Sequence, residues 1–324
     1  ALNSDPTVSP KEREDARRRY GEASRRVELL LNESDAAGQS DFYTYRYLAS
    51  EGFLPGYSFP RLPLAAYIPG SRGKDSSWLQ RSRFLAIREF GPGALIYHEG
   101  TRYQVTRIAL PRGGEGDTAG EVIRTEVKVC TECGYHHPRQ VGLDVCESCG
   151  APLTVVWKSM LQLQQVITRP RMRISADEEE RNRVGYELRT TYRFPLRPSP
   201  NGLVPGRLDA VVQDAHGEAL ADISYGDAAE IRVVNLGRRG RANKDVLGFN
   251  LDLVKGRWLP DHGEHPSDAD DGYEAELEDV KTRDRVLPYV EDRRNIAILR
   301  WAEPLDIETA VTLQYAIERG VETS

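Results

Sequence analysis

Apolar and polar positions alternate with a period of two along most of the chain, which is the pattern of half-buried β-strands. The turn sequences "GPG" and "HEGTR" interrupt the first of these stretches and favour hairpins there. The strand-like stretches are 84–110, 154–170, 185–194, 229–237, 248–260 and 294–305. We therefore expect small antiparallel sheets.

Helical patterns occur at three places. Residues 9–32 follow a candidate N-cap, Ser9, and carry many arginines, so they form either a solvated helix face or a surface for nucleic acid or a partner. Residues 175–183 have the spacing of a capping box. A third helix begins near Asp306 and is still periodic where the sequence ends, so we expect the chain to be part of a longer protein. Strands with a few helices predict an α+β fold.

Changes in composition divide the chain into four expected segments. The aromatic side chains of the second segment either stack on bases or pack against a neighbouring domain; they include Phe42, Tyr43, Tyr45 and Tyr47. The segments are a charged helix with a linker at 1–40, an aromatic-rich part with a small β domain at 41–125, a cysteine-containing insertion at 126–156, and an α+β domain at 157–324 that looks truncated.

The formal net charge of −6 over 324 residues excludes a protein whose whole surface attracts nucleic acid. Two local clusters of positive charge are candidates for phosphate binding, with exposed loops or intramolecular partners for acidic side chains as the equal alternative. The clusters are Arg169, Arg171 and Arg173, and Arg238, Arg239, Arg241 and Lys244.

All four cysteines lie in the sequence "CTECGYHHPRQVGLDVCESCG" at 130–150. They form two CxxC pairs, twelve residues apart, and a glycine follows each pair; the pairs are Cys130 with Cys133 and Cys146 with Cys149. Two such turns can close a tetrahedral shell of four thiolates, which predicts a structural Zn²⁺ site in an inserted zinc ribbon. Strand-like stretches on both sides of the ribbon predict that a hairpin joins its ends.

Other uses of four cysteines fit the pattern less well. A redox CxxC pair normally stands alone near a βαβ unit, and an iron–sulfur cluster rarely uses this symmetric spacing. A zinc deaminase needs an open coordination position, which four thiolates do not leave. His136 and His137 lie inside the ribbon and could replace a thiolate, but we expect them to be exposed or behind the ligands.

The sequence shows neither a nucleotide-binding motif nor a hydrolase motif, so we expect no catalysis from this segment alone. It contains no apolar run long enough to cross a membrane, and its clustered cysteines suit a reducing compartment. We therefore expect a soluble, cytoplasmic protein without a membrane partner.

Several stretches taken in order resemble the C-terminal region of large bacterial superfamily 2 DNA helicases, the group of the DISARM anti-phage helicase and the mitomycin-repair helicases. These stretches are "FYTYRYLASEGFLPGYSFPRLPL", "REFGPGALIYHEGTRYQV", the double CxxC block, "ADEEERNRVGYELRTTYRF" and "EDRRNIAILRWAEPLDIETAVTLQYAIERG". The resemblance extends from about residue 41 to the end of the sequence.

The resemblance implies an accessory region of an ATP-dependent helicase or translocase in phage defence or DNA repair, with the four cysteines as zinc ligands. It implies DNA as a partner, together with motor lobes or a partner subunit. ATP and Mg²⁺ would act only in the motor domains of the parent protein, whose motifs are not in this sequence. The alternative is a non-motor structural or protein-interaction subunit of a helicase-containing defence complex.

Overall fold

The computed structural model describes residues 63–70, 76–110, 124–138, 142–171, 185–200, 202–260 and 283–323. The expected helices at 9–32 and 175–183 lie outside these residues, as do Arg173 and the aromatic side chains at 42–47. Within the described part, the mixed α+β class is confirmed, with strands in the majority and the helices α3 and α6.

The chain divides into two compact units, which are described separately below. Unit 1 contains residues 1–193 and 231–293, and unit 2 contains residues 194–230 and 294–324. The units cut across the four segments expected from the sequence, because two long strands, β13 (Ala219–Arg238) and β16 (Arg283–Trp301), contribute to both.

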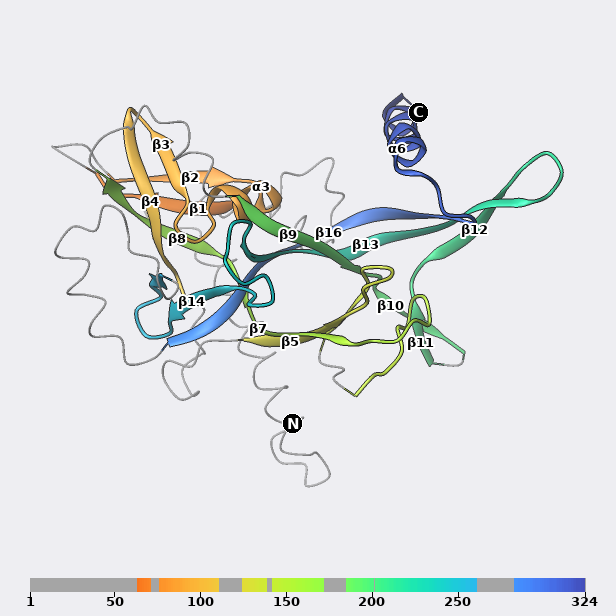
Figure 1. The fold of residues 1–324 in the computed structure, drawn as a ribbon, viewed down its shortest axis with the longest axis horizontal. Coiled ribbons are helices and arrows are strands. Elements are labelled where there is room, and N and C mark those ends of the chain that lie inside the picture. The colour runs from red at the N-terminus through yellow and green to blue at the C-terminus, as the bar shows by residue number, and fades with distance from the viewer. Residues whose placement is uncertain are drawn as a thin grey trace, which may run out of the picture. The chain divides into compact units, whose positions relative to one another are not determined.

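Unit 1 has a five-stranded sheet of order β2-β1-β8-β4-β3, shown in orange and green in Figure 1. Its strands are β1 (Leu64–Ile68), β2 (Ser77–Arg81), β3 (Leu95–His98), β4 (Thr101–Ile108) and β8 (Gln165–Arg171). The β3–β4 hairpin turns at Glu99 and Gly100, as "HEGTR" predicts. The pairing of β1 with β8 is parallel, which the sequence did not indicate, and the other neighbours are antiparallel.

The strand expected from residue 84 onward is wrong at its start, where the chain forms helix α3 (Arg83–Glu89). The carbonyl of Ser82 accepts the N–H groups of Leu85 and Ala86 and begins the helix. Ala86 and Ile87 are then fully buried in the core. A short apolar run is compatible with either a strand or a helix, and here its burial against the sheet decides the outcome.

The second sheet contains the strands around the cysteines. Its unit 1 strands are β5 (Thr125–Val129), β6 (His136–Pro138), β7 (Val155–Gln162), β9 (Tyr186–Arg193), β14 (Phe249–Asp252), β15 (Trp258–Leu259), and parts of β13 and β16. The order is β13-β16-β7-β5-β6; β9 pairs with β13, β14 pairs with both β15 and β16, and β7 and β16 are parallel.

The single strand expected at 248–260 is a hairpin, β14–β15, so this expectation is corrected. Gly256 in the turn has φ of 66°, and a Cβ there would lie 2.4 Å from the carbonyl oxygen of Ile108. Only glycine combines that backbone conformation with so close an approach, so the chain reverses at this point.

Two hydrophobic clusters form the core of unit 1. The larger one lies between the five-stranded sheet, α3 and β14, and includes Ala66, Val105, Val166 and Leu251. The smaller one gathers side chains from β5, β7, β13 and β16. The chain leading into and out of the cysteines is therefore anchored in a packed interior.

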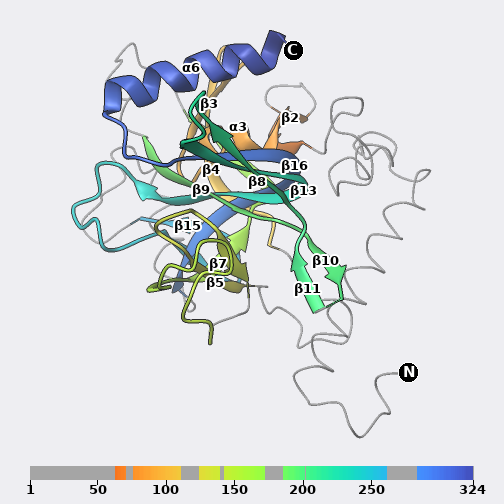
Figure 2. The same ribbon diagram turned by 90° about the vertical axis from the view of Figure 1, so that its right-hand side faces the viewer.

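Unit 2 contains β10 (Leu196–Ser199), β11 (Gly202–Pro205), β12 (Leu208–Gln213), the remaining parts of β13 and β16, and helix α6 (Ile307–Thr323). Figure 2 shows the β10–β11 hairpin. Among the described residues, neither hydrophobic cluster includes a unit 2 side chain, and Phe194 is its one large, fully buried residue. Asp306 caps α6 by accepting the N–H of Thr309, as expected. No helix of the described residues has the length and apolar character to cross a membrane.

Candidate metal centre

The first CxxC pair lies in the turn of the β5–β6 hairpin. Cys130 follows the last residue of β5, and its N–H donates to the carbonyl of Tyr135 at 3.0 Å. The N–H of Gly134 donates back to the carbonyl of Cys130 at 3.0 Å. Gly134 has φ of 75°, a conformation that side-chain-bearing residues rarely adopt, so the chain can turn with Cys130 and Cys133 on its inner side.

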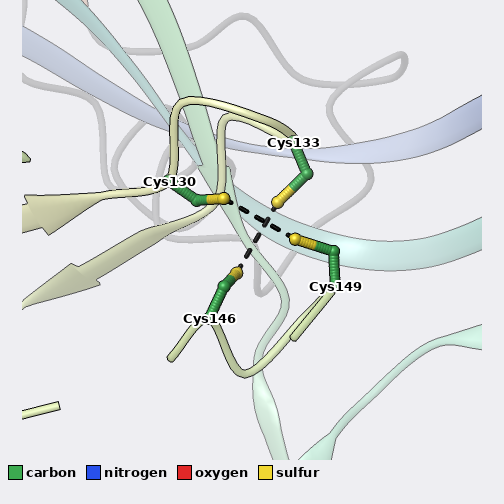
Figure 3. Close-up of side chains that lie close together, drawn as sticks. All are labelled: Cys130, Cys133, Cys146 and Cys149. Atoms are coloured by element: carbon green, nitrogen blue, oxygen red, sulfur yellow. Dashed lines mark hydrogen bonds between the residues drawn. The ribbon is translucent and has the colours of Figure 1, made fainter. Parts of the chain in front are cut away.

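The second CxxC pair repeats this geometry. The N–H of Cys146 donates to the carbonyl of Ala151 at 2.8 Å, and the N–H of Gly150 donates to the carbonyl of Cys146 at 2.9 Å. Gly150 has the same φ of 75° as Gly134. Two identical turns face each other and bring Cys149 and Cys146 opposite the first pair (Figure 3).

The four sulfur atoms form a compact group whose members all lie within 4.8 Å of one another. The Sγ atoms of Cys130 and Cys149 are 3.6 Å apart, and so are those of Cys133 and Cys146. A disulfide needs about 2.05 Å, so these are free thiols. Sulfur ligands about 2.3 Å from a central Zn²⁺ have tetrahedral edges of about 3.8 Å, so the cluster could hold a metal ion such as zinc.

Crowding and burial both disfavour four thiolates without a cation. Burial raises the pKa of Cys133 far above its ordinary value, and burial also raises the pKa of Cys146. Partial burial works against ionisation of Cys149 as well, but the N–H of Ala151 and the neighbouring sulfur atoms lower its pKa. A bound metal would replace the protons and neutralise the thiolates, and four sulfur ligands would leave no position for water.

The ribbon is attached to strand β9 of unit 1. Tyr135, which follows the first glycine, is fully buried and packs edge-to-face on Tyr192 with ring centroids 5.5 Å apart. The N–H of Tyr192 donates to the carbonyl of Gly134 at 3.2 Å, and the guanidinium of Arg193 lies 5.4 Å from the Tyr135 ring centre. The cysteine turns thus have a packed support, which the sequence did not reveal because β9 lies about 50 residues further along the chain.

His136 and His137 are completely buried, so of the two expected positions, exposed or behind the ligands, the structure shows the second. They lie behind the ribbon, outside the four-sulfur cluster. Nδ1 of His136 is 3.1 Å from Oγ1 of Thr191, and Arg193 donates to the carbonyl of His136 at 3.1 Å. Glu147, from the second turn, lies 3.1 Å from Arg193 and 3.5 Å from His137. These contacts connect both turns to β9.

The expected hairpin that joins the ends of the ribbon is confirmed. β5 and β7 are antiparallel neighbours, with Val129 opposite Val155. Lys128 on β5 is nearly buried; its Nζ donates to the carbonyl of Leu143 at 2.6 Å and lies 3.7 Å from Asp144. This lysine holds the loop between the two turns against the hairpin.

The first arginine cluster lies on β8 of the five-stranded sheet. Arg169 and Arg171 are two residues apart on that strand and are partly exposed, and Arg173 lies outside the described residues. Nε and Nη2 of Arg171 both donate to Oε1 of Gln104 on β4, at 2.8 and 2.5 Å. The two arginines therefore lie on one surface rather than in an irregular loop.

The second cluster consists of Arg238, Arg239, Arg241 and Lys244. Arg241 is turned inward, where it donates to the carbonyls of Arg238 and Lys244 and pairs with Glu187 at 2.8 Å. Nε of Arg239 donates to the carbonyl of Tyr186 at 3.1 Å. These arginines stabilise their own loop, which is the intramolecular alternative that the sequence left open, while Lys244 is exposed.

No family model matches the chain, and neither the curated proteins nor the solved structures include a match to it.

Proposed function

We propose that the four cysteines bind Zn²⁺ as a closed structural site in an accessory region of an ATP-dependent DNA helicase or translocase. The region contributes DNA or partner-subunit binding beside the motor, in phage defence or DNA repair. ATP and Mg²⁺ belong to the motor domains of such a protein. The observation that carries the proposal is the four-sulfur cluster, which lies in the middle of the ordered series of helicase-like sequence stretches.

Zinc fits the donor set better than other common metals do. Zn²⁺ accepts four thiolates in a tetrahedron, and closed four-sulfur shells are typical of structural rather than catalytic zinc. The ribbon has no hydrophobic core of its own, but its turns dock on β9 through Tyr135 and Arg193. Metal and docking together would then hold the ribbon as a rigid part of unit 1.

The experiment that tests the proposal is a fluorescence anisotropy titration of the zinc-loaded chain with single- and double-stranded DNA at low and at moderate salt. We expect binding that weakens as salt rises, since phosphate contacts release counterions. A folded, zinc-loaded chain that binds neither form of DNA at low salt would refute the DNA role. Elemental analysis of the same sample should give one zinc per chain.

A second candidate function, docking of a protein partner, is favoured by the surface of unit 2. Thirteen of the eighteen large apolar side chains that are exposed among the described residues belong to this unit. Unit 2 also carries eleven Asp and Glu residues against five Arg and no Lys, which is unfavourable for DNA. An amphipathic helix such as α6 can lie in an apolar groove of a partner that has basic side chains at its edge.

Helix α6 provides the test of this second function. Ile307, Val311 and Tyr315 lie at four-residue spacing on one exposed side of the helix. Replacing Val311 and Tyr315 by Asp should abolish binding of helicase motor lobes, measured by isothermal titration calorimetry. DNA binding by unit 1 should be unchanged in the same variant. Equal partner binding by wild type and variant would exclude α6 as the docking element.

A further inference from the structure

One face of the five-stranded sheet in unit 1 combines side chains from all five strands. The strands β1, β2 and β3 contribute aromatic rings, and β4 and β8 contribute arginines. We call it the arginine–aromatic face. It contains Tyr67, Trp78, Tyr97, Arg102, Arg169 and Arg171. None of these side chains belongs to either hydrophobic cluster.

The strand register places these residues on the same side of the sheet. Residues directly opposite each other on neighbouring strands point to the same face. Arg102 of β4 is opposite Tyr97 of β3 and Arg171 of β8. At the other edge, Tyr67 of β1 is opposite Trp78 of β2.

The residues between them point the other way, into the core. Tyr103 and Val105 alternate with Arg102 on β4, and both are buried. Val166 and Thr168 alternate with Arg169 on β8, and they are buried as well. The sheet therefore has one side that packs against the core and one side that carries the arginines and aromatic rings. On this second side Arg102 is buried, whereas Arg169 and Arg171 are partly exposed.

The charge of this sheet differs from that of the rest of the chain. Its five strands contain five arginines and neither Asp nor Glu, although the whole chain has 50 acidic residues. Arg107, a further member of these five, is opposite Ile167 on the same side as Arg169. The fifth, Arg81, pairs with Glu89 of α3 at 2.8 Å. Guanidinium groups gathered on one side of a sheet can attract the phosphates of a polyanion.

The aromatic rings occupy the two edges of the face and the arginines its centre. Tyr67 and Trp78 pack edge-to-face with centroids 5.2 Å apart, and each is partly exposed. Tyr97, on the opposite edge strand, is 41% exposed. Gln104 holds the guanidinium of Arg171 between them through two hydrogen bonds.

We infer that the arginine–aromatic face binds a single-stranded polynucleotide, whose bases stack on the edge aromatics and whose phosphates contact the partly exposed Arg169 and Arg171. The inference rests on the proposed DNA role and names the form of nucleic acid and the residues that bind it. Five strands about 4.8 Å apart span roughly 19 Å, enough for about four nucleotides. Aromatic rings on an open sheet can stack only on bases that are not already stacked within a duplex, so a single strand fits and a double helix does not.

The test measures binding of the zinc-loaded chain to a labelled oligothymidylate of about 12 nucleotides, to the matching oligouridylate, and to a duplex of the same length, by anisotropy. We expect the single strands to bind more tightly than the duplex. Comparison of the two single strands tells whether the 2′-hydroxyl and the thymine methyl group, in which they differ, contribute. Replacing Trp78 or Tyr97 by Ala should weaken binding roughly tenfold, the usual effect of losing one stacked base.

The arginine variants have a second readout. Replacing Arg169 and Arg171 by Gln should reduce the slope of log K against log salt by about 1.4, because each phosphate contact to a single strand contributes about 0.7. The matched control is Arg189→Gln on β9, which is exposed and outside the face and should bind as wild type does.

Folding is checked separately from binding. Trp78→Phe keeps a ring at this position and should retain most of the affinity, while the fluorescence quenching that the oligonucleotide causes at this tryptophan disappears. Thermal melting and zinc content of each variant show whether it is folded. Should Trp78→Ala not fold, Tyr97→Ala and the two arginine substitutions still test the face.

The outcomes separate this inference from the proposed function. Wild-type binding that the face variants leave unchanged in affinity and salt slope overturns the inference and leaves the DNA role in place. No polynucleotide binding by the folded wild type overturns both. Displacement of the oligonucleotide by polyglutamate as efficiently as by unlabelled oligonucleotide would show that the face recognises carboxylates of an acidic protein, which also overturns the inference.

Discussion

Replacing Cys146 by Ser should release the metal and unfold the ribbon, while the core of unit 1 stays folded. Structural zinc sites of small domains have binding free energies of about 10–16 kcal/mol, or roughly 2.5–4 kcal/mol for each of four ligands. Each 1.4 kcal/mol is a factor of ten, so loss of one thiolate should weaken zinc binding by about two to three orders of magnitude. Cys146 is almost fully buried and its Sγ is 3.6 Å from that of Cys133, so the serine hydroxyl would occupy the interior of the cluster without supplying a thiolate.

Hydrogen exchange shows how far the unfolding extends. The N–H of Tyr192 donates to the carbonyl of Gly134, so it should exchange faster once the first turn loses its shape. Amides of Val127, Val129 and Trp157 should stay protected, because their side chains belong to the smaller hydrophobic cluster rather than to the metal site. Exchange confined to residues 130–153 and to β9 is the expected pattern.

Glu147→Gln is the matched control for this variant. It keeps all four thiols but removes the ion pair with Arg193 at 3.1 Å, a contact that is only partly shielded from solvent. We expect it to retain one zinc per chain by elemental analysis and to loosen the ribbon only slightly, since partly exposed pairs contribute up to about 1 kcal/mol. If Cys146→Ser also retained one zinc per chain, the ligand assignment would be wrong.

Two further predictions concern unit 2. A Cβ at Gly226 would lie 2.3 Å from Cδ1 of the buried Phe194 ring, so Gly226→Ala should destabilise the protein by about 1–3 kcal/mol, measured by thermal melting. In the control Gly240→Ala the new Cβ meets no atom within 4 Å, and this variant should melt as wild type does. The side-chain hydroxyl and the N–H of Thr309 both donate to Asp306 and lower the pKa of that carboxyl. The stabilisation of α6 by this cap is therefore complete above the ordinary carboxyl pKa and is lost as pH falls through the lowered pKa. Circular dichroism should show that the helix content of wild type falls in acid, whereas Asp306→Ala should have less helix at every pH.

The four-sulfur cluster could be predicted from the sequence because its chemistry is local. The spacing of two residues within each cysteine pair and the glycine after it determine the shape of each turn, and strand-like residues on either side predict the β5–β7 hairpin. All of this information lies within about 40 consecutive residues. Local patterns also predicted the β3–β4 turn and the N-cap of α6.

The arginine–aromatic face could not be predicted, because it depends on pairing between distant strands. Arg171 lies opposite Arg102, about 70 residues earlier, and Tyr67 pairs in parallel with a strand about 100 residues later. A single sequence carries no direct record of which strands become neighbours. For the same reason the sequence left open whether His136 and His137 are exposed or lie behind the ligands, whereas the structure buries both, with Thr191 and Arg193 of β9 in contact with His136.

The parallel pairing of β7 with β16 determines the order in which unit 1 can assemble during synthesis. Leu287 and Tyr289 complete the smaller cluster, and Val286 and Val290 complete the larger one. Both interiors therefore wait for residues that leave the ribosome more than 100 positions after the cysteines. The β5–β7 hairpin and the two cysteine turns use hydrogen bonds between nearby residues, so we expect them to form first, before β9 and β16 are made and pack against them.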